Sequence, residues 1–245
     1  PFILSTGIYN INNFLAKTIY QELMMNVMTL KESVVATDLS AIAKGTKISN
    51  IPIALASAMA TALIPSISSD AKRGDKKSVR LKVAKSMKVT MLVSIPATVG
   101  IAVLAKPVMQ VIFNQPETLD LSARLLAVTS LSIIFYGMST LTQAVLQSIG
   151  KMITPIVHAA VALAVHAAAM AAMLLYLDNE YRMYYYVAAT VLYSVIVSIL
   201  NAYSLRKYLR YRQEKDKTFL SAVFASLIMG AVAYGVYHCV YLLVP

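Results

Sequence analysis

The sequence predicts an all-α polytopic membrane protein with about seven transmembrane helices. Of its 245 residues, 58% are hydrophobic and only 13% are charged, and the mean hydropathy is +0.67. A soluble domain carries about 25% charged residues. Turn residues and charges divide the chain into apolar segments that are long enough to cross a bilayer core of about 30 Å. Together these observations exclude an ordinary soluble domain.

Hydropathy and the breaks between segments define the predicted helices. A polar connection at 31–47 precedes the second helix. A part-helical form of this connection is left open. A short amphipathic piece, Pro107–Phe113, is expected at the interface before a turn at 114–116. The fifth helix is rich in Ala, which favours close packing. The helices run from about Phe2 to Met25, Ile48 to Ser69, Val83 to Ala105, Leu119 to Ile149, Ile153 to Leu177, Tyr184 to Leu205 and Phe219 to Val244.

The second helix has the composition of a transporter helix. Its sequence, ISNIPIALASAMATALIPSIS, is apolar and crowded with small residues, and a basic cluster at 72–77 follows it. Small residues let neighbouring helices approach closely in lipid. Pro52 and Pro65 each free a backbone carbonyl, which a neighbour or cavity water must satisfy. We therefore expect these prolines to break the helix and to act in gating.

Charge predicts the orientation of the chain. The gaps after the second, fourth and sixth helices hold most of the Lys and Arg residues, and the other gaps hold few. Basic residues favour the cytoplasmic side, so we expect the first helix to begin in the cytoplasm and the seventh to end outside. The basic run at 206–217 is interpreted as a cytoplasmic loop and topology signal, with attraction to anionic headgroups as the alternative.

A polar stripe follows the first helix. Side chains at steps of four, three, four and four residues share one helix face. A central Lys in a membrane helix costs about 2.5–3.5 kcal/mol, and it is tolerated where it faces a water-filled cavity or an acidic partner. We expect this face to line a cavity and contact a polar or anionic substrate. An amphipathic surface helix, and neutralisation of Lys17 by Glu22, stay open as alternatives. The stripe consists of Thr6, Asn10, Asn13, Lys17 and Gln21.

Four further residues carry weaker signals. Asn50 forms a polar shoulder before Pro52 and joins the cavity candidates. Arg124, one turn into the fourth helix, could hold a phosphate by a bidentate contact or snorkel to the interface. His158 and His166 lie roughly 80° apart around a helix, a separation that disfavours a metal pair and leaves proton coupling open.

Several functions are excluded by what the sequence lacks. Most Lys and Arg residues lie in gaps between apolar segments, so the net charge of +11 does not indicate nucleic-acid binding. The single cysteine, Cys239, lies in an apolar segment and offers no disulfide framework or thiolate metal site. There is no nucleophile–base constellation and no metal-ligand spacing, so we expect no catalytic residue, no metal and no cofactor. Because the chain begins and stops in apolar sequence, we expect a piece of a longer membrane protein.

Motifs in four places resemble a known transporter family. They are FILSTGIYNINNFL, the second helix with the following SSDAKRGD, IPATVGIAVLAKPVMQVIF and SLSIIFYGMSTLTQAVLQSIGK. They resemble the polysaccharide-biosynthesis, stage V sporulation protein B branch of the multidrug/oligosaccharidyl-lipid/polysaccharide exporter superfamily, which includes the lipid II flippases. The resemblance implies the second lobe of a two-lobe, MATE-like transporter of about fourteen helices. The lobe would occupy 1–205, the basic loop 206–217 and a thirteenth helix 218–245.

The resemblance implies a flippase that moves lipid II or polysaccharide repeat units across a bacterial plasma membrane by alternating access. Its partners would be undecaprenyl-linked saccharide and membrane lipids, with cell-wall synthases as further candidates. Coupling to H⁺, Na⁺ or membrane potential is left open. Relatives often have an N-x-x-D-Q pattern where this chain has Asn13, Ala16 and Lys17. The missing acid counts against cation coupling through this helix.

Two other functions stay open. A multidrug/cation antiporter of the same superfamily would need an acidic residue deep in the lobe, and the acids considered are Glu22 near a helix end and loop residues such as Asp70 and Asp75. A membrane scaffold would instead recruit cell-wall or spore-cortex synthases through the loop at 206–217.

Overall fold

The computed structural model describes the backbone of residues 2–113, 116–211 and 219–243. Side chains are described between residues 12 and 239, except at 114–115, 117, 179 and 212–218. Short turns of π-helix (Leu23–Val27) and 3₁₀-helix (Pro116–Thr118 and Asn179–Tyr181) connect longer helices. The described part contains no strand, which confirms the all-α fold. The helices are α1 (Phe2–Glu22), α2 (Glu32–Lys72), α3 (Lys76–Val103), α4 (Ala105–Phe113), α5 (Leu119–Ser148), α6 (Ile153–Tyr176), α7 (Arg182–Leu209) and α8 (Ser221–Leu243).

Six helices in the described part are long and apolar enough to cross a membrane: α2, α3, α5, α6, α7 and α8. Helix α1 has 21 residues, enough for about 30 Å, and the side chains of its first ten residues lie outside the described residues. The six apolar helices confirm a multi-pass membrane protein.

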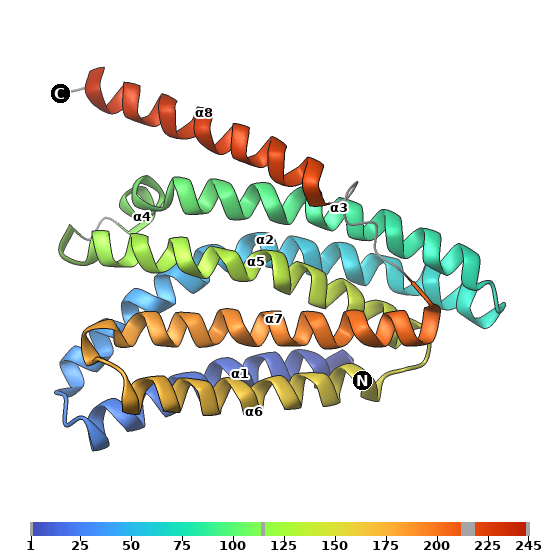
Figure 1. Ribbon diagram of the computed structural model, residues 1–245, viewed down its shortest axis with the longest axis horizontal. Coiled ribbons are helices and arrows are strands. Elements are labelled where there is room, and N and C mark those ends of the chain that lie inside the picture. The colour runs from blue at the N-terminus through green and yellow to red at the C-terminus, as the bar shows by residue number, and fades with distance from the viewer. Residues whose placement is uncertain (1, 114–115, 212–218, 244–245) are drawn as a thin grey trace.

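Helix α5 is the centre of the bundle. It packs against α2, α3, α4 and α7, and in Figure 1 it lies between α3 and α7. Most of its buried hydroxyls bond to carbonyls of the preceding turn, as Thr129 does to Leu125 (2.7 Å), which satisfies them within the apolar core. The buried Ser122 hydroxyl has no partner among the described residues. Helix α6 packs against α7 and α1, and α8 packs against α3 at the edge of the bundle.

Two glycines allow α3 to lie close to two of its neighbours, α5 and α8. A Cβ atom on Gly137 of α5 would lie 2.6 Å from the Oγ of Ser94, and a Cβ on Gly230 of α8 would lie 2.7 Å from the Cγ1 of Val99. Both distances are shorter than van der Waals contact. Association of helices in lipid depends on close packing, so the small residues hold α3 between α5 and α8.

Helix α2 corrects the predicted boundaries of the second segment. It begins at Glu32 rather than Ile48 and continues as one helix of 41 residues through Pro52 and Pro65. The expected helix break is therefore wrong at both prolines. Each proline removes one backbone hydrogen bond, whereas packing against α5 and α3 supports the helix along its length. Figure 1 shows α2 curved, not broken; a role of the prolines in gating stays a prediction.

The basic loop is shorter than predicted. Helix α7 continues to Leu209, so Arg206 and Lys207 form its last turn instead of opening the loop at 206–217. Cations at a helix C-terminus interact favourably with the helix dipole, which supports this extension. Of the rest of the predicted loop, Arg210 and Tyr211 follow the helix, and 212–217 lie outside the described residues, as do Asn114 and Gln115.

The chain crosses repeatedly between two ends of the bundle (Figure 1). The N-terminus, the α2–α3 and α5–α6 turns and the end of α7 lie at one end, which we call the basic end. The α1–α2 and α6–α7 connections lie at the opposite end. This alternation fits the topology predicted from charge; the cytoplasmic position of the basic end stays a prediction. Cations at the basic end are Lys72, Arg73, Lys76, Lys77, Lys151, Arg206, Lys207 and Arg210.

A buried ion pair joins three helices near the opposite end. Arg182 of α7 donates from Nε to Oδ2 of Asp38 on α2 (2.6 Å) and from Nη2 to Oδ1 (3.2 Å). Tyr20 of α1 is fully buried and donates its hydroxyl to the same Oδ2 (2.8 Å). The Asp38 side chain is only 6% exposed. The bidentate contact and the phenol satisfy a carboxylate that would otherwise be costly to bury.

We predict that removing either partner of this ion pair destabilises the lobe. D38N leaves the Arg182 charge without its partner, and R182Q does the same to Asp38; breaking a buried pair costs about 3–5 kcal/mol. Each single variant should lower the midpoint of thermal unfolding in detergent, and D38N/R182Q should recover part of the loss.

The matched control is K106Q. Lys106 pairs with Asp120 at 2.8 Å, but their side chains are 56% and 71% exposed, and exposed pairs contribute about 0–1 kcal/mol. A D38N variant that unfolds at the wild-type temperature would contradict the structural role of the ion pair.

Candidate substrate groove

A groove of about 550 Å³ lies between α1 and α2, in the half of the lobe opposite the basic end. Helix α1 contributes its polar face, α2 contributes a mixed polar and small-residue face, and α7 contributes one aromatic ring. The lining residues are Asn13, Lys17 and Gln21 of α1, Tyr186 of α7, and Glu32, Val35, Ala36, Leu39, Ser40, Ile42, Ala43, Thr46 and Lys47 of α2.

The two faces of α1 have different surroundings. Three residues of the predicted polar stripe line the groove at spacings of four residues, and so share one face. Another face packs into the bundle: Ala16 and Tyr20 are 2% and 0% exposed and belong to one core cluster with Met170 of α6. The structure therefore does not support the alternative of an amphipathic surface helix.

Two lysines line the groove from different helices. Lys17 belongs to α1 and Lys47 to α2, and both side chains are exposed to the open groove. Neither forms an ion pair within the described part of the chain. Glu22, the proposed partner of Lys17, instead accepts a hydrogen bond from Asn26. Neutralisation of Lys17 by Glu22 is thus not supported, and the groove lining carries two cations and one acid, Glu32.

The α2 wall of the groove was not expected from the sequence, because 31–47 was assigned to a connection. The stretch is helical, and Glu32, Ala36, Ser40, Ala43 and Lys47 recur at steps of four, four, three and four residues. That spacing was the signal for a helix face with polar and small side chains. Between them, Val35, Ala41 and Ile42 are buried and belong to the core.

Tyr186 connects the groove with the buried ion pair. Its ring contacts that of Tyr20 edge to face, with centroids 5.7 Å apart and planes at 85°. The Tyr20 hydroxyl in turn binds Asp38. The expectation that the acids of this lobe lie near helix ends or in loops is wrong, because Asp38 is 4% exposed within α2.

The structure does not bring every predicted site residue to the groove. Asn50 lies half-buried on α2, about one turn beyond Lys47, and Arg124 is exposed near the start of α5. The backbones of Thr6 and Asn10 belong to α1, but their side chains lie outside the described residues. Predicted residues that are described and are not among the groove lining are Asn50, Pro52, Pro65 and Arg124.

The two histidines of α6 make separate contacts. His158 Nδ1 lies 2.8 Å from Asn201 Oδ1, and its Nε2 lies 3.2 Å from the Ser204 hydroxyl, so it bonds α6 to α7. His166 is 1% exposed and its ring contacts that of Tyr193, with centroids 5.9 Å apart. Within the described residues, no cluster of His, Cys, Asp or Glu could hold a metal ion. Proton coupling through either histidine stays a prediction.

Fold and groove together define a class of protein. Six apolar helices form a multi-pass bundle, and a seventh, more polar helix lines a groove with two lysines and two side-chain amides. Polar and ionisable groups at membrane depth face cavities in proteins that move polar solutes. The arrangement is that of a multi-pass membrane protein with a polar groove, a feature that membrane transport proteins share.

The particular family follows from comparison with known proteins. The family model for the lipid II flippase MurJ matches residues 3–244, and the chain belongs to this family. It is similar to the lipid II flippase MurJ of Bacillus subtilis (strain 168), with 33% identity over 107 residues, 43% of this chain and 20% of that protein. It also resembles the probable lipid II flippase MurJ of Bdellovibrio bacteriovorus, with 27% identity over 121 residues, 47% of this chain and 23% of that protein.

The matched parts thus cover less than a quarter of the length of either relative. Family membership and the apolar helices place the chain in the bacterial plasma membrane as a multi-pass protein. They also support the exporter superfamily expected from the motifs. The family they name is MurJ rather than the stage V sporulation protein B branch, and a role in sporulation has no support from them.

Accessibility to water provides a test of the groove. In a C239S background, which removes the exposed native cysteine, we expect N13C, K17C and Q21C to react with a charged, water-soluble thiol reagent. Their rates should exceed that of A16C, which is on the buried face, on the order of tenfold, because thiol reactivity depends on access. The measurement is labelling in intact membranes. Equal rates at positions 16 and 17 would contradict a water-filled groove.

Proposed function

We propose that the chain is the second lobe of a longer flippase that moves lipid-linked saccharide precursors across the plasma membrane. Membership of the MurJ family supports the class of cargo, and the two relatives in the comparison are named lipid II flippases. The observation that carries the proposal for this lobe is that Lys17 and Lys47 line one groove without an ion-pair partner in the described part.

The lining of the groove suits an anionic, glycosylated substrate. Lys17 and Lys47 supply ammonium groups for a phosphate or pyrophosphate, and hydrogen bonds between charged groups are about twice as strong as neutral ones. Asn13 and Gln21 supply amides, which donate to and accept from sugar hydroxyls. The same wall of the groove therefore offers contacts for both polar parts of a lipid-linked saccharide.

The packing of the walls is compatible with alternating access. Helix α1 packs against α6, whereas α2 packs against α5 and α3. The contact of Tyr20 and Arg182 with Asp38 also holds α1, α2 and α7 together. We propose that the groove faces the other lobe of the full-length protein and that rocking of the lobes exposes it to alternate sides of the membrane. The driving force, whether H⁺, Na⁺ or membrane potential, is assigned to no residue of this lobe.

A multidrug/cation antiporter is the second candidate, and one observation favours it. Asp38 supplies a buried acid inside the lobe, which was not expected from the sequence. However, its carboxylate is bound by Arg182 and Tyr20, so an exchanged cation would have to displace a bidentate arginine. Recruitment of cell-wall synthases through the basic loop stays a prediction without a structural argument, since 212–218 lie outside the described residues.

Complementation tests the proposed function. The full-length protein that contains this chain should restore growth and outward movement of lipid-linked precursor in cells depleted of their own lipid II flippase. K17Q and K47Q should each reduce the rate of precursor export by about tenfold or more, because a hydrogen bond to a charged group contributes about 1.5–3 kcal/mol. The matched control is K85Q, which removes an exposed cation of α3 outside the groove.

Export at the wild-type rate by K17Q/K47Q would contradict the role of the groove. Failure of the wild-type protein to rescue, despite good membrane expression, would contradict lipid II as cargo and favour another lipid-linked glycan. Failure together with gained drug resistance would favour the antiporter.

A further inference from the structure

A second, smaller pocket lies at the basic end, away from the groove. Its volume is about 190 Å³, and it forms where the α2–α3 turn, the α5–α6 turn and the end of α7 meet. Its polar lining consists of Lys76, Lys151 and Tyr208, and the buried side chains of Val79 and Leu209 lie beside them. The pocket therefore combines residues that are far apart in the sequence.

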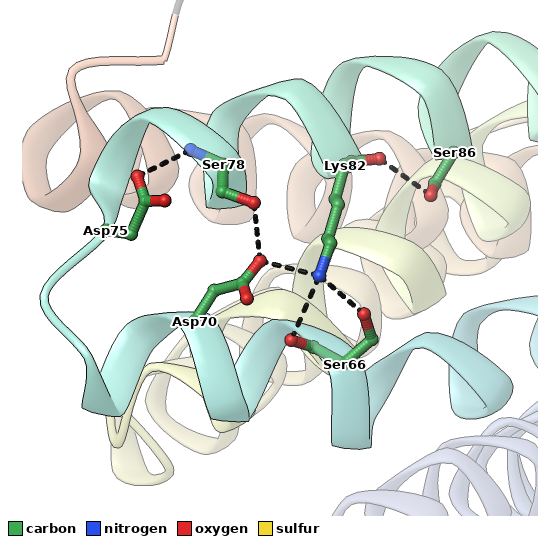
Figure 2. Close-up of polar contacts among 6 residues, drawn as sticks. All are labelled: Ser66, Asp70, Asp75, Ser78, Lys82 and Ser86. Carbon is green, nitrogen blue, oxygen red and sulfur yellow. Dashed lines mark hydrogen bonds and ion pairs between the residues drawn. The ribbon is translucent and has the colours of Figure 1, made fainter.

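The acids nearest to this pocket in the sequence already have partners. Figure 2 shows Asp70 of α2 bound by Lys82 of α3 at 2.6 Å. Asp75 accepts a backbone N–H in the first turn of α3 at 2.9 Å, and so caps that helix. Within the described part of the chain, Lys76 and Lys151 form no ion pair. The pocket thus holds two lysines that form no ion pair with a described carboxylate.

An aromatic ring positions one of these charges. The Lys151 Nζ lies 5.0 Å from the centroid of the Tyr208 ring, and the Lys207 Nζ lies 5.9 Å from the same centroid. Cation–π contact of this kind favours an ammonium close to the ring. With Lys76 on the facing turn, cations surround a hollow that is large enough for a small tetrahedral anion. Lysines bind such anions as point charges, and the Tyr208 hydroxyl could donate a hydrogen bond.

The position of the pocket favours a lipid as the source of the anion. Helices α2, α5 and α7, which are candidate membrane spans, all end here, and basic residues at the ends of such spans lie at the level of lipid headgroups. Directly after Lys151, helix α6 presents apolar residues: Ile153 is 73% exposed and Val157 is 50% exposed. This surface suits an acyl chain, whereas a soluble phosphate has no need of it.

We propose that this pocket binds the phosphate of an anionic phospholipid, such as phosphatidylglycerol, in the leaflet at the basic end. Lys76 and Lys151 bind the headgroup, and the start of α6 contacts an acyl chain. The bound lipid links the α2–α3 turn to the α5–α6 turn. The site is separate from the groove and does not depend on the flippase activity.

Lipid titration followed by native mass spectrometry tests this site on the full-length protein, purified in neutral detergent. We expect phosphatidylglycerol to bind with higher affinity than phosphatidylcholine. K76Q/K151Q should weaken the tightest phosphatidylglycerol site about 25-fold, since a lysine near an anionic lipid surface contributes about 1 kcal/mol, or about fivefold. K76R/K151R keeps both charges and should retain binding, which excludes loss of the turn structure as the cause.

The matched control is K85Q/K88Q, which removes two exposed charges of α3 outside the pocket and should change the affinity less than about twofold. Wild-type affinity of K76Q/K151Q for phosphatidylglycerol would overturn the proposal. So would equal binding of phosphatidylcholine. Displacement of the lipid by millimolar inorganic phosphate would also overturn it, because the pocket would then be a site for soluble phosphate.

Discussion

The contact between Asp38 and Arg182 is the constraint on which the arrangement of this lobe depends. A carboxylate inside a membrane helix must be satisfied, and here a bidentate guanidinium and the Tyr20 phenol do so. Because the three residues come from α2, α7 and α1, the helices are fixed relative to one another at the end where the groove lies. Tyr186, which lines the groove, packs directly on Tyr20.

With α1, α2 and α7 held together by this contact, the two faces of α1 have different environments. Its buried face contacts the core through Ala16 and Tyr20, and its polar face lines the groove through Lys17 and its neighbours. The cost of a lysine at membrane depth is reduced by the open groove, so the charge persists without a carboxylate partner. A group that is tolerated only because water reaches it is also available to an anionic substrate. The open groove that makes Lys17 compatible with the fold is therefore also the feature that would let Lys17 bind a substrate.

The sequence predicted the all-α class, most helix limits and the polar face of α1, because these depend on local composition and periodicity. It missed whatever depends on partners far away in the chain. The polar stretch 31–47 looked like a connection because the partner of Asp38 is 144 residues away and Lys44 donates to the Thr118 hydroxyl (3.1 Å). Once such residues are satisfied, the stretch forms a helix whose other face carries Lys47. The expected break at the prolines was wrong for a related reason, since packing of α2 against α5 and α3 supports the helix that contains Pro52 and Pro65.

Photo-crosslinking within the full-length protein is the most direct measurement of whether the groove holds the cargo. A photoreactive residue would replace Gln21 in the groove or, as the control, Val161, which is 48% exposed on α6 outside it. Membranes would then be irradiated with labelled lipid-linked precursor present. The groove model predicts labelled precursor attached at position 21 and little or none at position 161. Attachment at position 161 alone, or equally at both positions, would contradict it.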